Sequence, residues 1–161
     1  AAPGGTGDAS DAQAAEVPLR VTRVSVLLAL FCSGSGSQES DVCKAAGKAL
    51  LTLAHADETT WACTLAEFLH LGGVVELVDA VEDAAREAGP SGARRLRLLV
   101  ELLLRGFEGE AVRRFAGPEL AAERKRLLNA LFGAGDAYAR LAVGLLLVRL
   151  LADGWGAAGE T

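Results

Sequence analysis

The sequence contains no methionine, one tyrosine and only two tryptophans. Aromatic residues make up 5% of the 161 positions, so a core built on aromatic packing is excluded. The shortage also disfavours a β-sandwich, which uses many aromatic and β-branched side chains. Hydrophobic residues nevertheless make up 51% of the chain, and alanine and leucine dominate among them. We therefore expect an all-α protein whose closely packed helices share an aliphatic core.

Long apolar runs are also missing. The longest uninterrupted run, residues 141–148, ends at Arg149, whereas a transmembrane helix needs about 20 apolar residues. We therefore expect no transmembrane segment. The first residues have no signal-peptide pattern and methionine is absent throughout, so we expect a processed chain from which any targeting peptide has been removed.

Cysteine is scarce as well. Cys32, Cys43 and Cys63 form no C-x-x-C pair, and the only histidines that could join them in a site are His55 and His70. An odd and sparse set is typical of buried thiols in a reducing compartment rather than of a disulfide framework, although sequence leaves disulfides open. We expect an intracellular location, either cytoplasmic or in an organelle, and neither a metal nor another cofactor.

The chain has no uncompensated positive charge. Its net charge is −5, with ten acids and four bases in residues 1–80, and eleven acids and twelve bases in residues 81–161. The second half is thus rich in arginine but almost neutral. Proteins that bind nucleic acids usually carry an unbalanced basic face, so we expect no nucleic-acid partner.

One pattern, an apolar helix followed by a Gly/Ser loop and a second apolar helix, occurs three times. The three copies cover residues 21–31, 33–37 and 41–54, then 74–86, 89–92 and 93–105, then 119–132, 133–135 and 137–152. A period of this length is typical of stacked helical repeats. We expect one helical domain over residues 19–153, between flexible tails at 1–18 and 154–161.

Local signals place some helix ends and surface pairs. Asp57 or Thr59 is predicted to cap a middle helix, and Asp136 to cap the last one. Glu82 and Arg86 are spaced to pair on the outside of their helix.

Two stretches, residues 68–78 (FLHLGGVVELV) and 115–120 (FAGPEL), resemble the armadillo-repeat family. Each is similar to the end of the family's short first helix, a corner glycine and the start of the second helix. Gly73 and Gly117 would be the corner glycines, because two helices that meet nearly at right angles need a residue without Cβ at their contact. The resemblance implies a short right-handed α-solenoid of about three repeats, with third helices that begin near Asp41, Ala93 and Ala137.

A polar stripe follows these third helices. The resemblance implies that it lines a concave surface where extended partners bind. The first helix contributes Asp41, Lys44, Lys48, Thr52 and His55, and the second contributes Arg94, Arg97, Glu101 and Arg105. On the third helix the stripe continues through Arg140, Val143, Leu147 and Leu151 and turns apolar. We expect another subunit or further chain to pack on this apolar part, or alternatively the C-terminal tail with Trp155 to fold back over it. The partner-binding residues are therefore predicted to be Lys44, Lys48, Arg94, Arg97, Glu101, Arg105, Arg140, Leu147 and Leu151. A plain solvated face, on which Arg97, Glu101 and Arg105 pair with one another, remains the alternative.

Catalytic signals are weak. The sequence has no HExxH, GxSxG or phosphate-loop pattern. Cys63, Glu67 and His70 share a helix face but lack a third orienting group, so an enzyme centred on Cys63 is the less favoured hypothesis. Two basic clusters, Arg94–Arg95–Arg97 and Arg124–Lys125–Arg126, suit phosphate but are more typical of wet helix faces. We expect a non-enzymatic scaffold or adaptor that binds protein, or alternatively an accessory subunit of a large assembly.

Overall fold

The computed structural model describes residues 21–32 and 41–155, and all regular structure in these ranges is helical. The predicted tail 1–18 and the loop 33–37 lie outside the described residues, as do residues 156–161 of the C-terminal tail. The expected all-α fold class is confirmed. The helices are Val21–Cys32, α2 (Asp41–Ala56), α3 (Glu58–His70), α4 (Gly73–Arg86), α5 (Pro90–Gly106), α6 (Glu110–Ala116), α7 (Ala121–Gly133) and α8 (Ala137–Arg149), with a 3₁₀ turn η1 (Pro118–Leu120) and a π-helical turn η2 (Leu150–Trp155).

The helix ends follow the local signals in most places. The Asp57 carboxylate accepts a hydrogen bond from the Thr59 backbone N–H at 3.1 Å, and Asp136 accepts one from Tyr138 at 2.8 Å, so both predicted caps are confirmed. The predicted start at Ala93 is wrong, because α5 begins at Pro90, where proline's missing N–H costs no hydrogen bond.

Gly73 lies at a sharp corner. The helices α3 and α4 are bent by 101° from one another, and the intervening Gly72 adopts a left-handed conformation with φ of 89°. A Cβ placed on Gly73 would lie 2.5 Å from the Phe68 ring, which is fully buried. The corner therefore requires glycine for close approach, as the sequence predicted. At Gly117 a Cβ would meet only the end of the Glu119 side chain, at 2.6 Å, so the requirement there is softer.

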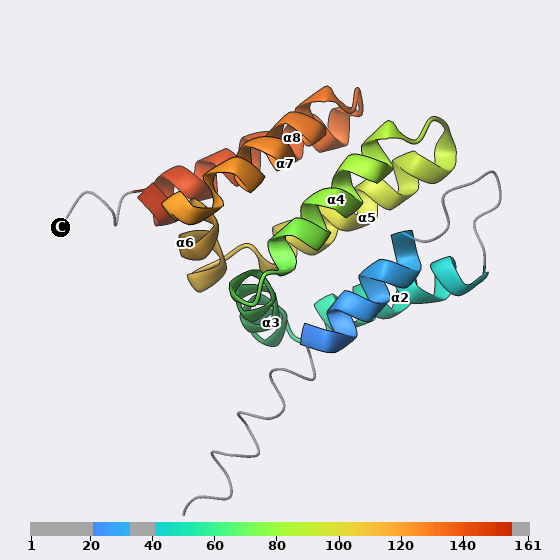
Figure 1. Cartoon of the computed structure of the whole chain (residues 1–161), viewed down its shortest axis with the longest axis horizontal. Helices are drawn as coiled ribbons and strands as arrows, with labels where there is room; N and C mark the ends of the chain where they lie inside the picture. The colour runs from blue at the N-terminus through green and yellow to red at the C-terminus, as the bar shows by residue number, and fades with distance from the viewer. Residues whose placement is uncertain (1–20, 33–40, 156–161) are drawn as a thin grey trace, which may run out of the picture.

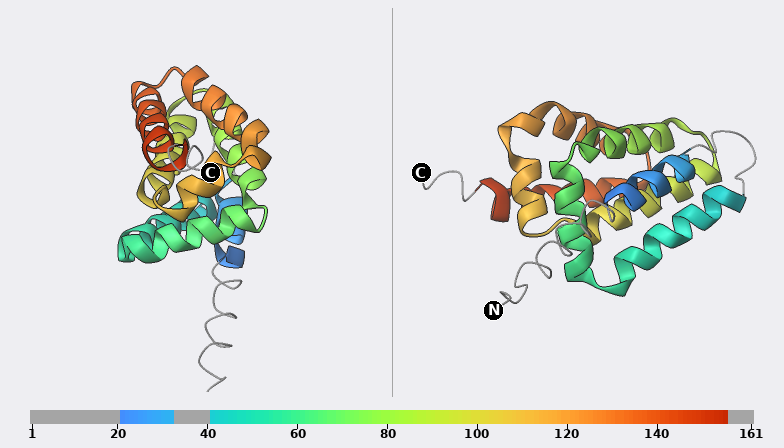
Figure 2. Two further views of the ribbon diagram at one scale, coloured as in Figure 1. Left: turned by 90° about the vertical axis from the view of Figure 1, so that its left-hand side faces the viewer. Right: turned by 60° about the horizontal axis from the view of Figure 1, so that its bottom comes forward.

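The helices pack in corresponding pairs. Three pairs lie side by side in Figure 1, namely Val21–Cys32 with α2, α4 with α5, and α7 with α8. α3 packs against α6, α4 against α7, and α5 against both α2 and α8. Figure 2 shows α3 and α6 running across the ends of these pairs. Each helix of the set α3–α4–α5 thus contacts its counterpart in the set α6–α7–α8.

Burial recurs at a fixed interval along the chain. Phe68 and Phe115 are both fully buried and lie 47 positions apart, and the same interval relates Leu65 to Val112 and Ala80 to Leu127. The helices α2, α5 and α8 share one burial pattern, in which an offset of 49 relates α2 to α5 and an offset of 47 relates α5 to α8. The buried residues are Cys43, Ala46, Gly47, Leu50 and Ala54; Gly92, Arg95, Leu96, Leu99 and Leu103; and Ala139, Ala142, Val143, Leu146 and Leu150.

The centre of the core joins α3 to α5. The buried Trp61 indole N–H donates to the Leu102 carbonyl at 2.9 Å. Phe107 and Phe115 meet edge to face, with ring centroids 5.1 Å apart. Some large hydrophobic residues of α2 and α4 are exposed, including Val42, Leu53 and Val75.

No single helix in the described ranges is long and apolar enough to cross a membrane. The bent pair α3–α4 passes such a test only when its two helices are taken together, on length and composition alone.

Candidate protein-binding surface

The helices α2, α5 and α8 form one layer with α5 in the middle, and most predicted binding residues lie on it. We call the exposed side of this layer the third-helix surface. Lys44 and Lys48 are exposed on α2, and neither forms an ion pair within residues 21–32 and 41–155. Arg94 is exposed on α5, and Arg140 on α8. The layer therefore presents separate cations rather than a single basic patch.

The stripe on α5 forms ion pairs with neighbouring helices. Glu101 contacts His55 Nε2 of α2 at 3.3 Å and Arg105 Nε at 3.2 Å. Arg105 in turn reaches Glu58 of α3 at 3.7 Å. These pairs are partly exposed, so each contributes roughly 0–1 kcal/mol to stability, and their main effect is to fix where the carboxylate points.

Arg97 does not form the pair with Glu101 that a plain solvated face of α5 was predicted to have. Its Nε lies 3.2 Å from Asp136, the residue that caps α8, instead of pairing with Glu101. The hydrogen bond from the Tyr138 backbone N–H, followed by the contact with Arg97, lowers the pKa of Asp136 below its usual range. The predicted self-pairing of α5 is thus wrong for Arg97 and holds only for Glu101 and Arg105.

The predicted continuation of the stripe on α8 is displaced. Val143 is only 8% exposed, and Leu147 is half-buried against the core, because these positions belong to the inward side of the helix. Leu151 is exposed, as predicted. Exposed apolar residues here are Leu141 (63% exposed), Leu145 and Val148 (62% exposed) on α8, and Leu151 on η2.

A hollow of about 940 Å³ separates α5 from α8 on this surface. Arg97 and Glu101 line one side of it, and Tyr138 and Leu141 line the other. One wall is therefore charged, and the other combines the Asp136 carboxylate with the side chains of Tyr138 and Leu141. Sequence reasoning placed Arg97 and Glu101 in the binding stripe but missed Tyr138 and Leu141, because it read α8 one register away.

Arg95 does not belong to an exposed basic cluster, contrary to the prediction. Its side chain is buried, with the residue only 4% exposed, and it forms an ion pair with Glu87 at the end of α4. Arg94 and Arg97, its neighbours in the sequence, are exposed. Arg95 therefore cannot present charge to a partner at the surface.

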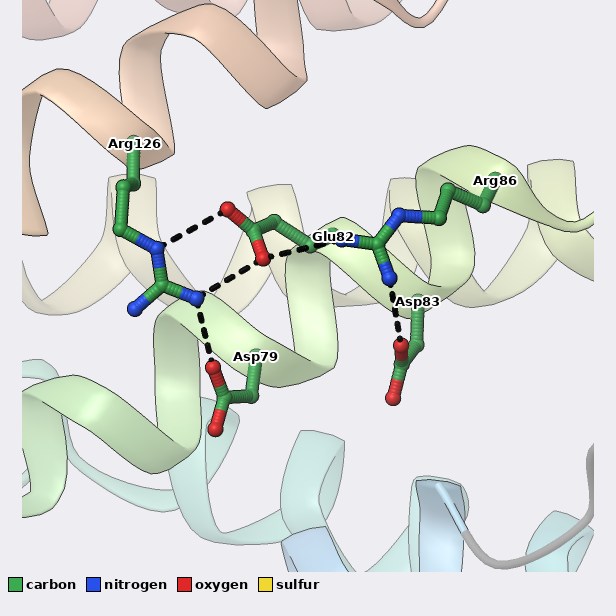
Figure 3. Close-up of polar contacts among 5 residues, drawn as sticks. All are labelled: Asp79, Glu82, Asp83, Arg86 and Arg126. Atoms are coloured by element: carbon green, nitrogen blue, oxygen red, sulfur yellow. Dashed lines mark hydrogen bonds and ion pairs between the residues drawn. The ribbon is translucent and has the colours of Figure 1, made fainter.

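The second basic cluster is also structural. Figure 3 shows Arg126 of α7 reaching across to α4, where it binds Glu82 at 2.8 Å and Asp79 at 2.7 Å. The hydrogen bond from Arg126 lowers the pKa of Glu82, and Arg86 adds the predicted pair to Glu82 at 3.3 Å. Arg124 donates to the backbone carbonyl of Phe115 at 2.6 Å. Of this cluster, Lys125 is the fully exposed member.

In the candidate thiol site, His70 contacts an arginine of another helix. His70 Nδ1 lies 2.7 Å from Arg114 Nη1 of α6, and because arginine only donates, the ring nitrogen accepts. Cys63 is exposed, so the expectation that all three thiols are buried is wrong for it. Cys43 is buried and its thiol contacts the Leu30 carbonyl at 3.2 Å, while burial raises the pKa of Cys32 to about 11. No cluster of His, Cys, Asp and Glu suited to a metal occurs in the described part of the chain.

Comparison of the chain with protein-family models, with curated protein sequences and with solved structures gives no match.

Proposed function

We propose that the chain forms a short right-handed α-solenoid of about three armadillo-like repeats and acts as a non-enzymatic scaffold. The 47-residue recurrence of burial supports the repeat, because stacked units bury equivalent positions. The contacts of α3 with α6, α4 with α7 and α5 with α8 support it as well. The corner at Gly73 has the close helix approach that the resemblance implies.

The third-helix surface is the proposed docking site for a protein partner. The observation that carries this proposal is the mixed hollow between α5 and α8, on the same helix layer as Lys44 and Lys48 of α2, which form no ion pair within the described residues. A partner segment that crosses the layer would place acidic residues beside the lysines and Arg97, and an apolar residue against Leu141. Recognition of this kind needs a few buried anchors and charges at the rim.

The alternative is an accessory subunit that is built permanently into a large assembly. One observation favours it, namely that Phe132 of α7 is 66% exposed while Leu141, Leu145 and Val148 of α8 are also open to solvent. Where exposed apolar residues form a large patch, the patch usually marks a surface that another protein covers. An isolated subunit should then self-associate, and mild detergent should reverse the association.

Charge-reversal variants distinguish docking on the third-helix surface from a permanent apolar interface. We expect that Lys44→Glu with Arg97→Glu abolishes capture of the partner that co-purifies with the full chain, as measured by quantitative mass spectrometry. Lys125→Glu on α7 is the matched control, because Lys125 is exposed and lies outside the third-helix surface. Circular dichroism confirms that both variants keep their helix content. Unchanged capture by the double variant would refute docking on this surface, and loss only in Leu141→Asp would favour the permanent apolar interface.

A further inference from the structure

A second concave surface lies at the other end of the row of helix pairs. It is a groove of about 770 Å³ between the helix Val21–Cys32 and α2. Its floor consists of Val26 and Leu27 from the first helix, and Ala45, Ala49 and Leu53 from α2. In Figure 1 this pair is the outermost of the three, so no described helix pair covers its outer side. We call this surface the N-terminal groove.

The N-terminal groove lies on the side of α2 that corresponds to the side of α5 against which α2 packs. The offset of 49 that relates α2 to α5 makes Ala49 equivalent to Leu98, and Thr52 equivalent to Glu101. Leu98 and Glu101 are residues through which α5 contacts α2. A Cβ on Gly47 of α2 would lie 3.1 Å from Leu98, and His55 of α2 pairs with Glu101 at 3.3 Å. A helix can therefore lie on α2 much as α2 lies on α5.

The charges around the N-terminal groove select one kind of helix. Arg23 and Lys48 line it, and its described lining residues include no acidic one. Neither cation has an ion pair within the described residues. Lys44 lies one turn from Lys48 on α2, so it adds a third positive charge to Arg23 and Lys48. An apolar floor between these cations complements an apolar helix face flanked by carboxylates.

A second copy of this chain suits the N-terminal groove poorly. The exposed apolar residues of α8 lie beside Arg140, and α7 carries the exposed Lys125. Docking that end into the groove would bring like charges together, which disfavours association. The composition of the groove therefore points away from head-to-tail stacking and toward a partner with acidic flanks.

We propose that the N-terminal groove binds an amphipathic helix of a partner protein, whose apolar stripe fills the floor while acidic residues along its flanks pair with Arg23 and Lys48. This site shares Lys48 with the third-helix surface, but none of its described lining residues lines the hollow between α5 and α8. It would let the scaffold hold two protein segments at once, one at its end and one along its layer.

The test is selection from a displayed library of helical peptides of the length of α2, 16 residues. The apolar stripe is constant, and the flanking positions vary among Glu, Lys, Gln and Ser. The baits are the full chain, its Val26→Asp variant and its Arg97→Glu variant. Val26 is about half exposed, so the aspartate blocks the groove without entering the core. Circular dichroism checks that each bait is folded.

We expect glutamate to be enriched at the flanks, and the selected peptides to bind Val26→Asp at least about tenfold more weakly, as measured by fluorescence anisotropy. The double reversal Arg23→Glu and Lys48→Glu should favour lysine-flanked peptides. Binding by Arg97→Glu should be unchanged, which separates this site from the third-helix surface. Enrichment of neutral or basic flanks, equal binding to Val26→Asp, or no enriched peptide would each overturn the proposal. Self-association of the chain that Val26→Asp abolishes would also overturn it, because the occupant would then be a second copy.

Discussion

Gly106 and Gly144 offer a direct test of the packing, because the same change should alter stability in opposite directions. A Cβ on Gly106, the last residue of α5, would lie 2.6 Å from Trp61 Nε1 and 2.7 Å from Leu65 Cδ2. Both neighbours are buried, and the Trp61 indole is held by its 2.9 Å hydrogen bond to Leu102. Neither side chain can withdraw without losing packing or that hydrogen bond.

The magnitude of the Gly106→Ala effect follows from two opposing terms. Overpacking of a well-filled core costs about 1–3 kcal/mol. Alanine is a better helix former than glycine by up to about 1 kcal/mol, but only part of this gain applies at the last residue of a helix. We therefore expect a net loss of about 1–2 kcal/mol. For a chain of this size, a loss of 1 kcal/mol lowers Tm by roughly 2–4 °C.

Gly144→Ala is the matched control. Gly144 lies inside α8, and a Cβ there would meet nothing within 4 Å. The helix-propensity gain is then unopposed, so we expect stabilisation by about 1 kcal/mol. Urea unfolding followed by circular dichroism at a helix-sensitive wavelength measures both changes on one scale.

A double variant locates the clash. Trp61→Phe removes the indole N–H and shortens the side chain that faces Gly106. We expect Gly106→Ala to be less damaging in the Trp61→Phe background, with a coupling of at least about 0.5 kcal/mol. A neutral or stabilising Gly106→Ala, or additive effects in the double variant, would refute the described packing of α3 on α5.

Three further outcomes are expected. Phe115→Ala, at a residue 1% exposed against Phe107's ring, should destabilise the chain by about 3–5 kcal/mol, whereas Phe132→Ala, at a residue 66% exposed, should change stability by less than about 0.5 kcal/mol. Because the pKa of Glu82 is lowered in the folded state from an ordinary value of 4.5, its stabilising contribution is complete above that value and is lost as pH falls below it. Arg126→Gln should therefore flatten the loss of stability between about pH 5 and pH 3, and an unchanged acid limb in urea titrations would contradict this cause. In the native chain, iodoacetamide should label Cys63 and leave the other two cysteines unmodified until the chain unfolds, as peptide mass mapping can check.

The sequence predicts the helices better than it predicts their rotation. Caps and glycines act within one turn, so Asp57, Asp136 and Gly73 could be assigned from nearby residues alone. The side of a helix that becomes buried depends on which helices lie against it. In α8 nearly every position is apolar, so hydrophobic periodicity cannot tell Leu141 from Val143. The exposed apolar side of α8 therefore lies about one residue position away from the predicted side.

Long side chains were the second source of error in the candidate site. Sequence reasoning paired Arg97 with Glu101 by their spacing within one helix, and it treated Arg126 as part of a solvated basic cluster. In the structure, each reaches a carboxylate on another helix, Arg97 to Asp136 and Arg126 to Glu82. Partners some 40 residues away in the chain leave no local signal, and only the packing of corresponding helices brings them together.

Arg95 shows what the recurrence of burial adds to local pattern. Its neighbours Arg94 and Arg97 are exposed, so a local view assigns all three to one basic cluster. The interval of 47 instead aligns Arg95 with the buried Ala142, and the interval of 49 aligns it with the buried Ala46. The recurrence thus fixes where burial occurs but not which residue fills the position. An arginine at an alanine position must carry its charge to a partner, and Glu87, placed at the end of α4, supplies one. Alignment with its counterparts on α2 and α8 therefore places Arg95 on the buried side of α5, which its neighbours in the sequence do not indicate.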